Sequence, residues 1–190
     1  MRTSSIRKNF ASHLYLACCH KKDSWQPAFQ YVHFQNDYAY ATDGNVLAKQ
    51  ALYYSGVIDK ENLNGKKIHK DVFKNILKFD VATAKVDGIE CYENATGATT
   101  FFKYDNGDHK APNFEIVIND DYESVAFVGI DPKHIQIADK CLAREFDRDP
   151  SPLEFMFNGC NKPVHITAKN IQDQVFLITP TQIKTEWQKV

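Results

Sequence analysis

The stretch from Ala39 to Ala48 reads AYATDGNVLA, and its pattern is that of two β-strands joined by a tight turn. The Asp43-Gly44 pair at its centre tolerates the positive φ that a tight turn requires, and strand-like runs flank it on both sides. Further pairs of this kind punctuate the chain, namely Asn64-Gly65, Asp87-Gly88, Asn106-Gly107 and Asn158-Gly159. The sequence therefore predicts many short strands connected by turns.

Runs rich in aromatic and β-branched residues recur between these turns, as is typical of strands. The expected strands are 29–34, 38–41, 46–52, 89–92, 99–104, 123–130, 153–157, 164–167 and 175–179. Segments 5–18, 69–79 and 131–142 instead have apolar residues at helical spacing. The last of these begins with Asp131 and Pro132, which suit the N-cap and the first helical position.

The order of these elements indicates a structural repeat. Each helix is followed by about three strands, and this unit recurs roughly every 60 residues, so about three units fill the chain. The expected fold is α+β, built from repeated helix-plus-antiparallel-strands units with the helices on one face of the sheets. We expect two domains. The first, residues 1–118, contains two helix-plus-strands units, and the second, residues 119–190, is a partial unit of the same kind.

Composition excludes several classes of protein. The net charge of -1 argues against a general nucleic-acid coat, so any DNA contact must come from local patterning. The longest apolar run near the N-terminus, residues 14–19, is too short for a membrane span or a signal core, which predicts a cytoplasmic protein without membrane contact. The five cysteines show no CxxC spacing, so neither a disulfide framework nor a zinc site is expected, and no cofactor is predicted.

Catalytic motifs are not found in the sequence. The histidines have no HExxH or other metal-ligand spacing, and there is no GxGxxG, P-loop or GxSxG motif. A catalytic protein would need a nucleophile, an acid–base pair or a metal cluster, so we expect a binding protein and not an enzyme.

Lysines form stripes on the expected helices, opposite the apolar faces. They are Lys66, Lys67, Lys70, Lys74 and Lys78 at the second helix, and Lys133 and Lys140 on the third. Two interpretations remain open. The lysines either solvate amphipathic helices, or they form one basic surface that faces phosphates without reading bases.

Three stretches, taken in order, resemble the beta subunit of bacterial DNA polymerase III, the DNA sliding clamp. Residues 39–48 resemble its Ala-Thr-Asp-Gly hairpin, residues 111–118 its Phe-Pro-Asp-Tyr stretch, and residues 175–183 its final strand. The sequence also departs from the family. Asn45-Val46 replace a basic pair, Asn119 replaces a proline, and Thr179 and Thr181 replace two methionines.

The resemblance implies a ring-forming fold in which helices face double-stranded DNA and sheets form the outer wall. It also implies a groove in which replication or repair proteins dock a short hydrophobic peptide. That groove maps onto Thr42, Gly44, Leu47, Leu177, Thr179 and Pro180. The alternative is that Leu47 and Leu177 are ordinary core residues of strands.

The expected function is that of a sliding-clamp-like, DNA-associated protein serving as a processivity or docking factor. A homo-oligomer is compatible with this expectation. A full clamp has six half-units and this chain about three, so a second interpretation stays open: a protein–protein adaptor that has the clamp fold and does not encircle DNA.

Overall fold

The computed structural model describes residues 13–19, 26–118, 122, 125, 128–142, 152–168 and 173–181. The strands are β1 (Tyr31–Gln35), β2 (Tyr38–Thr42), β3 (Val46–Ala51), β4 (Lys67–His69), β5 (Val81–Ala84), β6 (Gly88–Tyr92), β7 (Thr99–Lys103), β8 (Leu153–Met156), β9 (Val164–Ala168) and β10 (Gln174–Ile178). The α-helices are α2 (Lys70–Ile76) and α3 (Pro132–Cys141). Short 3-10 helices are η1 (Leu14–Ala17), η2 (Pro27–Gln30), η3 (Leu52–Ser55), η4 (Lys60–Leu63) and η5 (Phe114–Val117).

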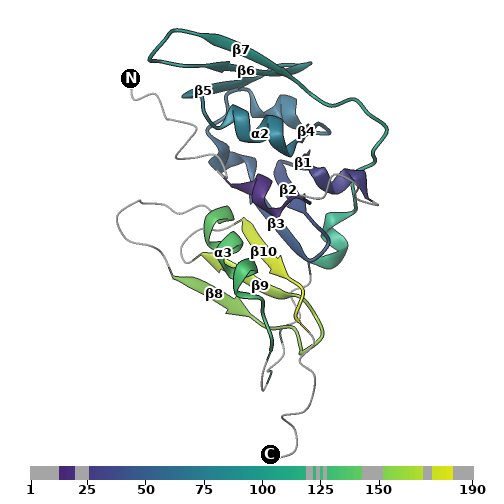
Figure 1. The fold of residues 1–190 in the computed structure, drawn as a ribbon. Helices are drawn as coiled ribbons and strands as arrows, with labels where there is room; N and C mark the ends of the chain where they lie inside the picture. Colours follow the sequence, from purple (N-terminus) through teal and green to yellow (C-terminus); the bar gives the residue numbers. More distant parts are fainter. Residues whose placement is uncertain are drawn as a thin grey trace, which may run out of the picture.

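The strands form two antiparallel sheets (Figure 1). The larger is seven-stranded with the order β4-β1-β2-β3-β10-β9-β8, and the smaller is three-stranded with the order β5-β6-β7. The pair β3–β10 joins strands from the two predicted domains into one sheet. The division at residue 118 therefore stays a prediction, and the sheet itself is continuous across it.

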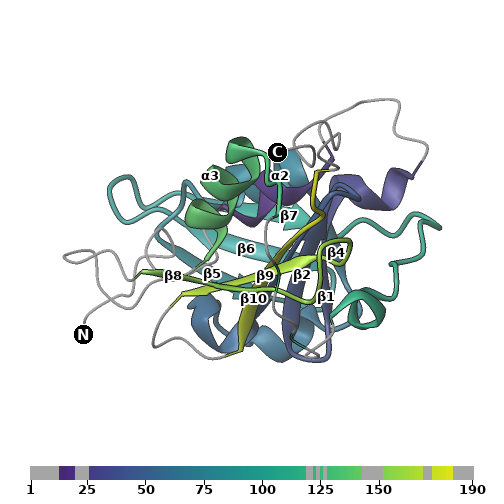
Figure 2. The same ribbon diagram turned by 90° about the horizontal axis from the view of Figure 1, so that it is seen from below.

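One face of the large sheet is covered by helices. In Figure 2, α2 and α3 lie on the same side of its strands. Apolar side chains on this face are buried, among them Ala41, Ala48 and Phe176. As expected, Asp131 caps α3, since its side chain accepts a hydrogen bond from the Lys133 backbone N–H at 2.9 Å.

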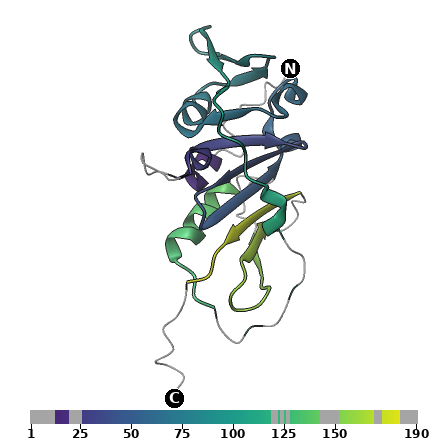
Figure 3. The ribbon, with the colours of Figure 1, turned by 90° about the vertical axis from the view of Figure 1, so that its right-hand side faces the viewer.

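The opposite face carries a separate apolar cluster. Because side chains alternate along a strand, Tyr40, Leu47 and Leu177 point away from the helices and pack together with Phe114. Figure 3 shows η5, in teal, on the side of the sheet opposite the green helix α3. The outer face of the sheet is therefore partly covered by a 3-10 helix and the chain that leads to it.

The predicted α+β architecture, with helices on one face of antiparallel sheets, is confirmed. The second and third expected helices correspond to α2 and α3, while the first lies largely outside the described residues and only its end appears, as η1. Segment 123–130 is also only partly described, and there Gly129 forms an isolated bridge with Thr181. The sequence did not predict β4 and β5. No helix in the described part of the chain is long and apolar enough to cross a membrane.

Candidate docking site

The turn between β2 and β3 is held by its own side chains. The Thr42 hydroxyl donates to the Val46 carbonyl at 2.6 Å and accepts from the Gly44 N–H at 3.0 Å. The Asp43 carboxylate accepts from the Asn45 and Val46 N–H groups. Gly44 has φ +93°, a conformation that L residues rarely adopt. The threonine, aspartate and glycine of this motif thus fix the shape of the turn.

A surface hollow of about 220 Å³ lies beside this turn, on the outer face of the sheet. Its lining is Phe29, Thr42, Gly44, Asn45, Val46, Leu47, Pro112, Asn113, Phe114, Val117, Pro163, Leu177 and Thr179. None of these side chains carries a charge, and Leu47 and Leu177 lie directly opposite each other in the β3–β10 pair. The hollow can therefore accept an apolar group without removing a charge from water.

The structure brings most of the predicted groove residues together. Thr42, Gly44, Leu47, Leu177 and Thr179 all line the hollow. Pro180 is not part of the lining, although it directly follows Thr179 and is half-buried. That these residues bind a peptide stays a prediction.

Sequence reasoning missed the remaining lining residues. Asn45 and Val46 come from the β2–β3 turn and the start of β3, Phe29 comes from η2, and Pro163 precedes β9. Pro112, Asn113, Phe114 and Val117 come from the η5 region. The η5 residues did carry a signal, since residues 111–118 form the second stretch that resembles the clamp family. That stretch carries the resemblance to the family, but its sequence alone does not place it beside the groove.

The segment 105–118, which we call the strap, crosses the outer face and supplies one wall of the hollow. Phe114 stacks on Tyr40, with ring centroids 4.7 Å apart and planes 5° apart. The Tyr40 hydroxyl donates to Glu115, and the Lys49 ammonium lies 2.9 Å from the same carboxylate. Partial burial raises the pKa of Glu115, but the bonds from Tyr40 and Lys49 outweigh it and the pKa is lowered.

The other end of the strap is fixed as well. The Tyr31 hydroxyl donates to Asp105 at 3.0 Å, and the Lys67 ammonium donates to the carbonyls of Gly107 and His109 at 2.5 and 2.7 Å. With the Tyr40, Lys49 and Glu115 contacts, the strap is held at both ends by side chains from β1 to β4. The wall of the hollow is thus attached to the first half of the sheet.

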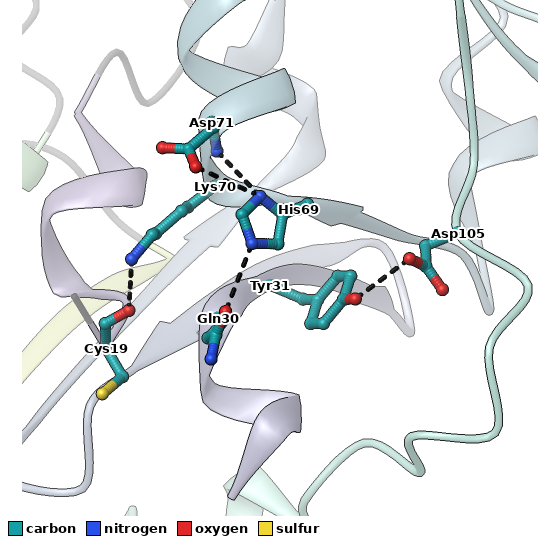
Figure 4. Close-up of polar contacts among 7 residues, drawn as sticks. All are labelled: Cys19, Gln30, Tyr31, His69, Lys70, Asp71 and Asp105. Carbon is teal, nitrogen blue, oxygen red and sulfur yellow. Dashed lines mark hydrogen bonds and ion pairs between the residues drawn. The ribbon is translucent and has the colours of Figure 1, made fainter. Parts of the chain in front are cut away.

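The predicted lysine stripe is wrong at Lys67 and Lys70, which are only 9% and 8% exposed. The helix begins at Lys70, so Lys66 and Lys67 do not lie on it; Lys66 precedes β4 and Lys67 is its first residue. Figure 4 shows the Lys70 ammonium donating to the Cys19 carbonyl, a bond of 2.6 Å. In the same view His69 accepts from the Asp71 N–H and so caps α2. Two of the expected surface cations therefore bind backbone carbonyls inside the molecule.

The other lysines expected on the helices are exposed. They are Lys74 on α2, Lys78 just beyond its C-cap, and Lys133 and Lys140 on α3. Both helices lie on the same side of the large sheet (Figure 2). Lys66 is half-buried, with its ammonium 5.5 Å from the ring of Tyr104. DNA contact by these lysines stays a prediction.

Comparison with known proteins defines the fold. No family model matches the sequence, and no curated protein matches it. Solved structures do match: the sliding clamp of Bacillus subtilis is 14% identical with a TM-score of 0.66, covering 94% of this chain and 62% of that one. The Streptococcus pyogenes clamp is 10% identical with a TM-score of 0.65, covering 94% and 64%. A Pseudomonas aeruginosa clamp is 10% identical with a TM-score of 0.62, covering 94% and 65%.

The chain therefore has the DNA sliding-clamp fold. More specifically, the matching structures are beta subunits of bacterial DNA polymerase III, so the resemblance predicted from the sequence is confirmed for the fold. The chain spans about 62% of the length of the Bacillus subtilis clamp.

Proposed function

We propose that this protein is a clamp-like docking factor without catalytic activity, which binds a short hydrophobic segment of replication or repair proteins in the hollow beside Gly44. The observation that carries the proposal is the uncharged hollow itself, because it is built where the three clamp-like stretches meet. Residues 42–47, 112–117 and 177–179 each supply part of its lining. Apolar walls next to backbone groups of a fixed turn are typical of peptide-binding grooves.

Ligands bound to structures of the same fold support the choice of partner. The Bartonella birtlesii clamp, 12% identical over 93% of this chain, is bound to griselimycin. The C. crescentus clamp, 12% identical over 94% of this chain, has polyethylene glycol at a region assigned to beta-motif tethering. In our proposal the hollow of this chain is the corresponding tethering site.

Binding of a fluorescently labelled peptide rich in leucine and phenylalanine tests the proposal, with griselimycin as an unlabelled competitor. Val117 lines the hollow and is 47% exposed, whereas its neighbour Ile116 is 75% exposed and does not line it. We expect Val117→Glu to weaken peptide binding at least roughly tenfold, because a charge would have to be desolvated at the site. Ile116→Glu is the matched control and should bind like the wild type.

Two results would contradict the docking proposal. One is that the wild-type chain shows no saturable binding of either probe. The other is that both variants bind the peptide as well as the wild-type chain does. Neither variant is expected to unfold the chain, since both side chains are substantially exposed.

The proposal extends to double-stranded DNA on the helix-covered face. The exposed lysines of α2 and α3 support a non-specific contact with phosphates, which would be weak and sensitive to salt. If the chain binds the peptide but not DNA, the adaptor interpretation replaces this part of the proposal. Peptide binding and DNA retention are therefore measured separately.

A further inference from the structure

A second hollow, of about 370 Å³, lies on the outer face of the large sheet, between strands β1 and β4 and residues 105–111 of the strap. His33 and Lys67 line it and lie directly opposite each other in the β1–β4 pair. His33 is also directly opposite Tyr40, which packs on the outer face, so the second hollow faces away from α2 and α3. The ring centroids of His33 and Phe114 are 5.5 Å apart, and Phe114 also lines the candidate docking site. The two hollows are therefore neighbours on one face of the sheet.

The two hollows differ in charge. The docking site has no charged side chain in its lining, whereas the second hollow is lined by Lys66, Lys67, Lys110 and Asp105, three cations against one carboxylate. Within the part of the chain that the structure describes, neither Lys66 nor Lys110 forms an ion pair. Burial and the charge on Lys67 keep the pKa of His33 below its usual range, so the positive charge comes from the lysines. The second hollow therefore favours an anion over a cation or an apolar group.

Lys67 is held in place by the strap and still has one N–H group for a ligand. Its ammonium donates to the carbonyls of Gly107 and His109 at 2.5 and 2.7 Å, and an ammonium has three N–H groups. The carboxylate in the lining is already engaged, since Asp105 accepts from the Tyr31 hydroxyl (Figure 4) and from the Gly107 N–H at 2.7 Å. These contacts fix the position of the ammonium group and reduce the repulsion that an incoming anion would meet.

We propose that the second hollow binds a small inorganic phosphate anion, such as pyrophosphate, between the ammonium groups of Lys66, Lys67 and Lys110. Phosphate oxygens accept several charge-assisted hydrogen bonds at once, and lysine binds them as a point charge. A nucleotide matches the hollow less well. The one phenyl ring in the lining, that of Phe34, is fully buried and so cannot stack on a base.

This anion site is separate from both parts of the proposed function. The lysines proposed to contact duplex DNA belong to the helix-covered side of the sheet, whereas the second hollow is on the outer face. Peptide binding would use the neighbouring, uncharged hollow. Either site can therefore fail its test without affecting the other.

Calorimetric titration of the full chain with pyrophosphate at constant ionic strength tests the site. We expect saturable binding, and at least a roughly tenfold loss of affinity in Lys66→Gln/Lys110→Gln, because two charge-assisted contacts are removed. Lys67 stays intact in this variant because it holds the strap. Lys85→Gln/Lys103→Gln removes the same charge at exposed lysines outside the hollow and is the matched control.

Three results would overturn the anion site. They are no saturable binding by the wild type, unchanged affinity in Lys66→Gln/Lys110→Gln, and an equal loss of affinity in the control variant. Adenosine diphosphate, titrated separately, distinguishes a free anion from phosphate carried on a nucleotide. We expect it to bind no more tightly than pyrophosphate, and tighter binding would overturn the inorganic assignment.

Amide chemical shifts locate the bound anion. Gly65 and Gly107 line the second hollow, whereas Gly44 lines the docking site. In ¹⁵N–¹H spectra, pyrophosphate should shift the signals of Gly65 and Gly107 and leave that of Gly44 in place. Shifts confined to the amides of α2 and α3 would show binding on the helix-covered face and would overturn the placement. A larger shift at Gly44 than at Gly107 would overturn it as well.

Discussion

Leu47 of β3 and Leu177 of β10 lie directly opposite each other in the β3–β10 pair, which we call the seam of the large sheet. Both side chains line the hollow beside Gly44. The same two side chains thus join the halves of the sheet and form the floor of the candidate groove. Stability and docking should therefore be coupled at this pair.

Leu177→Ala should lower the free energy of unfolding by about 2–5 kcal/mol, the usual cost of removing a buried leucine side chain. Leu177 is buried against Tyr40, Leu47 and Phe114, so the cavity it leaves is bordered by ordered side chains. Leu77→Ala, at the half-buried C-cap of α2, is the control and should cost less. Urea denaturation measures both, and equal costs would show that the seam is not tightly packed.

Gly44→Ala should destabilise the chain more than Gly65→Ala. Both glycines have positive φ, +93° and +74°, which costs an L residue about 1 kcal/mol or more. A Cβ at Gly65 would meet no atom within 4 Å, whereas one at Gly44 would lie 3.2 Å from the Phe29 ring. Thermal denaturation compares the two variants. Of these two variants, only Gly44→Ala should also lower the affinity for the peptide, because Gly44 lines the docking hollow and Gly65 does not.

Glu115→Gln should change how stability depends on pH. The pKa of Glu115 is lowered in the folded chain, so its carboxylate contributes stability above its unfolded pKa of about 4.3. That contribution is lost as the pH falls through the lower pKa that Glu115 has in the folded chain. The wild type should exceed the variant in stability near neutral pH, and the difference should shrink in acid. Urea midpoints across the acid range measure it, and a difference that grows in acid would contradict the assignment.

Lys74→Glu/Lys140→Glu should reduce retention on duplex DNA at low salt. Each phosphate that the protein no longer neutralises should lower the slope of log affinity against log salt by about 0.9. Lys85→Glu/Lys103→Glu makes the same charge change at two other exposed lysines, Lys85 just after β5 and Lys103 at the end of β7, and is the matched control. If both double variants lost DNA retention equally, the effect would come from net charge and not from a defined DNA-binding surface. Unchanged retention of both would favour the adaptor interpretation.

The sequence predicted the strands that combine a short apolar run with turn residues at its ends. Strands β2, β3 and β10 are runs of this kind, mostly buried on both faces, and their positions were expected to within a few residues. The strand β4 was missed because two of its three residues, Lys67 and His69, are polar. They occur there because their side chains bond the strap and cap α2, contacts with segments that no local pattern reveals.

The groove was only partly predictable, for a related reason. Its strand residues belong to short motifs that can be read along the chain, whereas Phe29 and Pro163 reach the hollow only through tertiary packing. The error at Lys70 has a local cause. Helical spacing places its side chain among the surface lysines, but at the first residue of α2 it turns toward the Cys19 carbonyl.

The seam between β3 and β10 also sets the order in which the site can assemble. A ribosome releases the N-terminal part of a chain first, and pairings between distant segments form slowly. The hairpin of β2 and β3 and the strap that stacks on Tyr40 can fold before β10 has been synthesised, since their contacts lie within residues 31–118. Leu177 is synthesised after them, in β10. A nascent chain would therefore form the wall of the candidate groove first, and the groove is completed only once β10 has paired with β3.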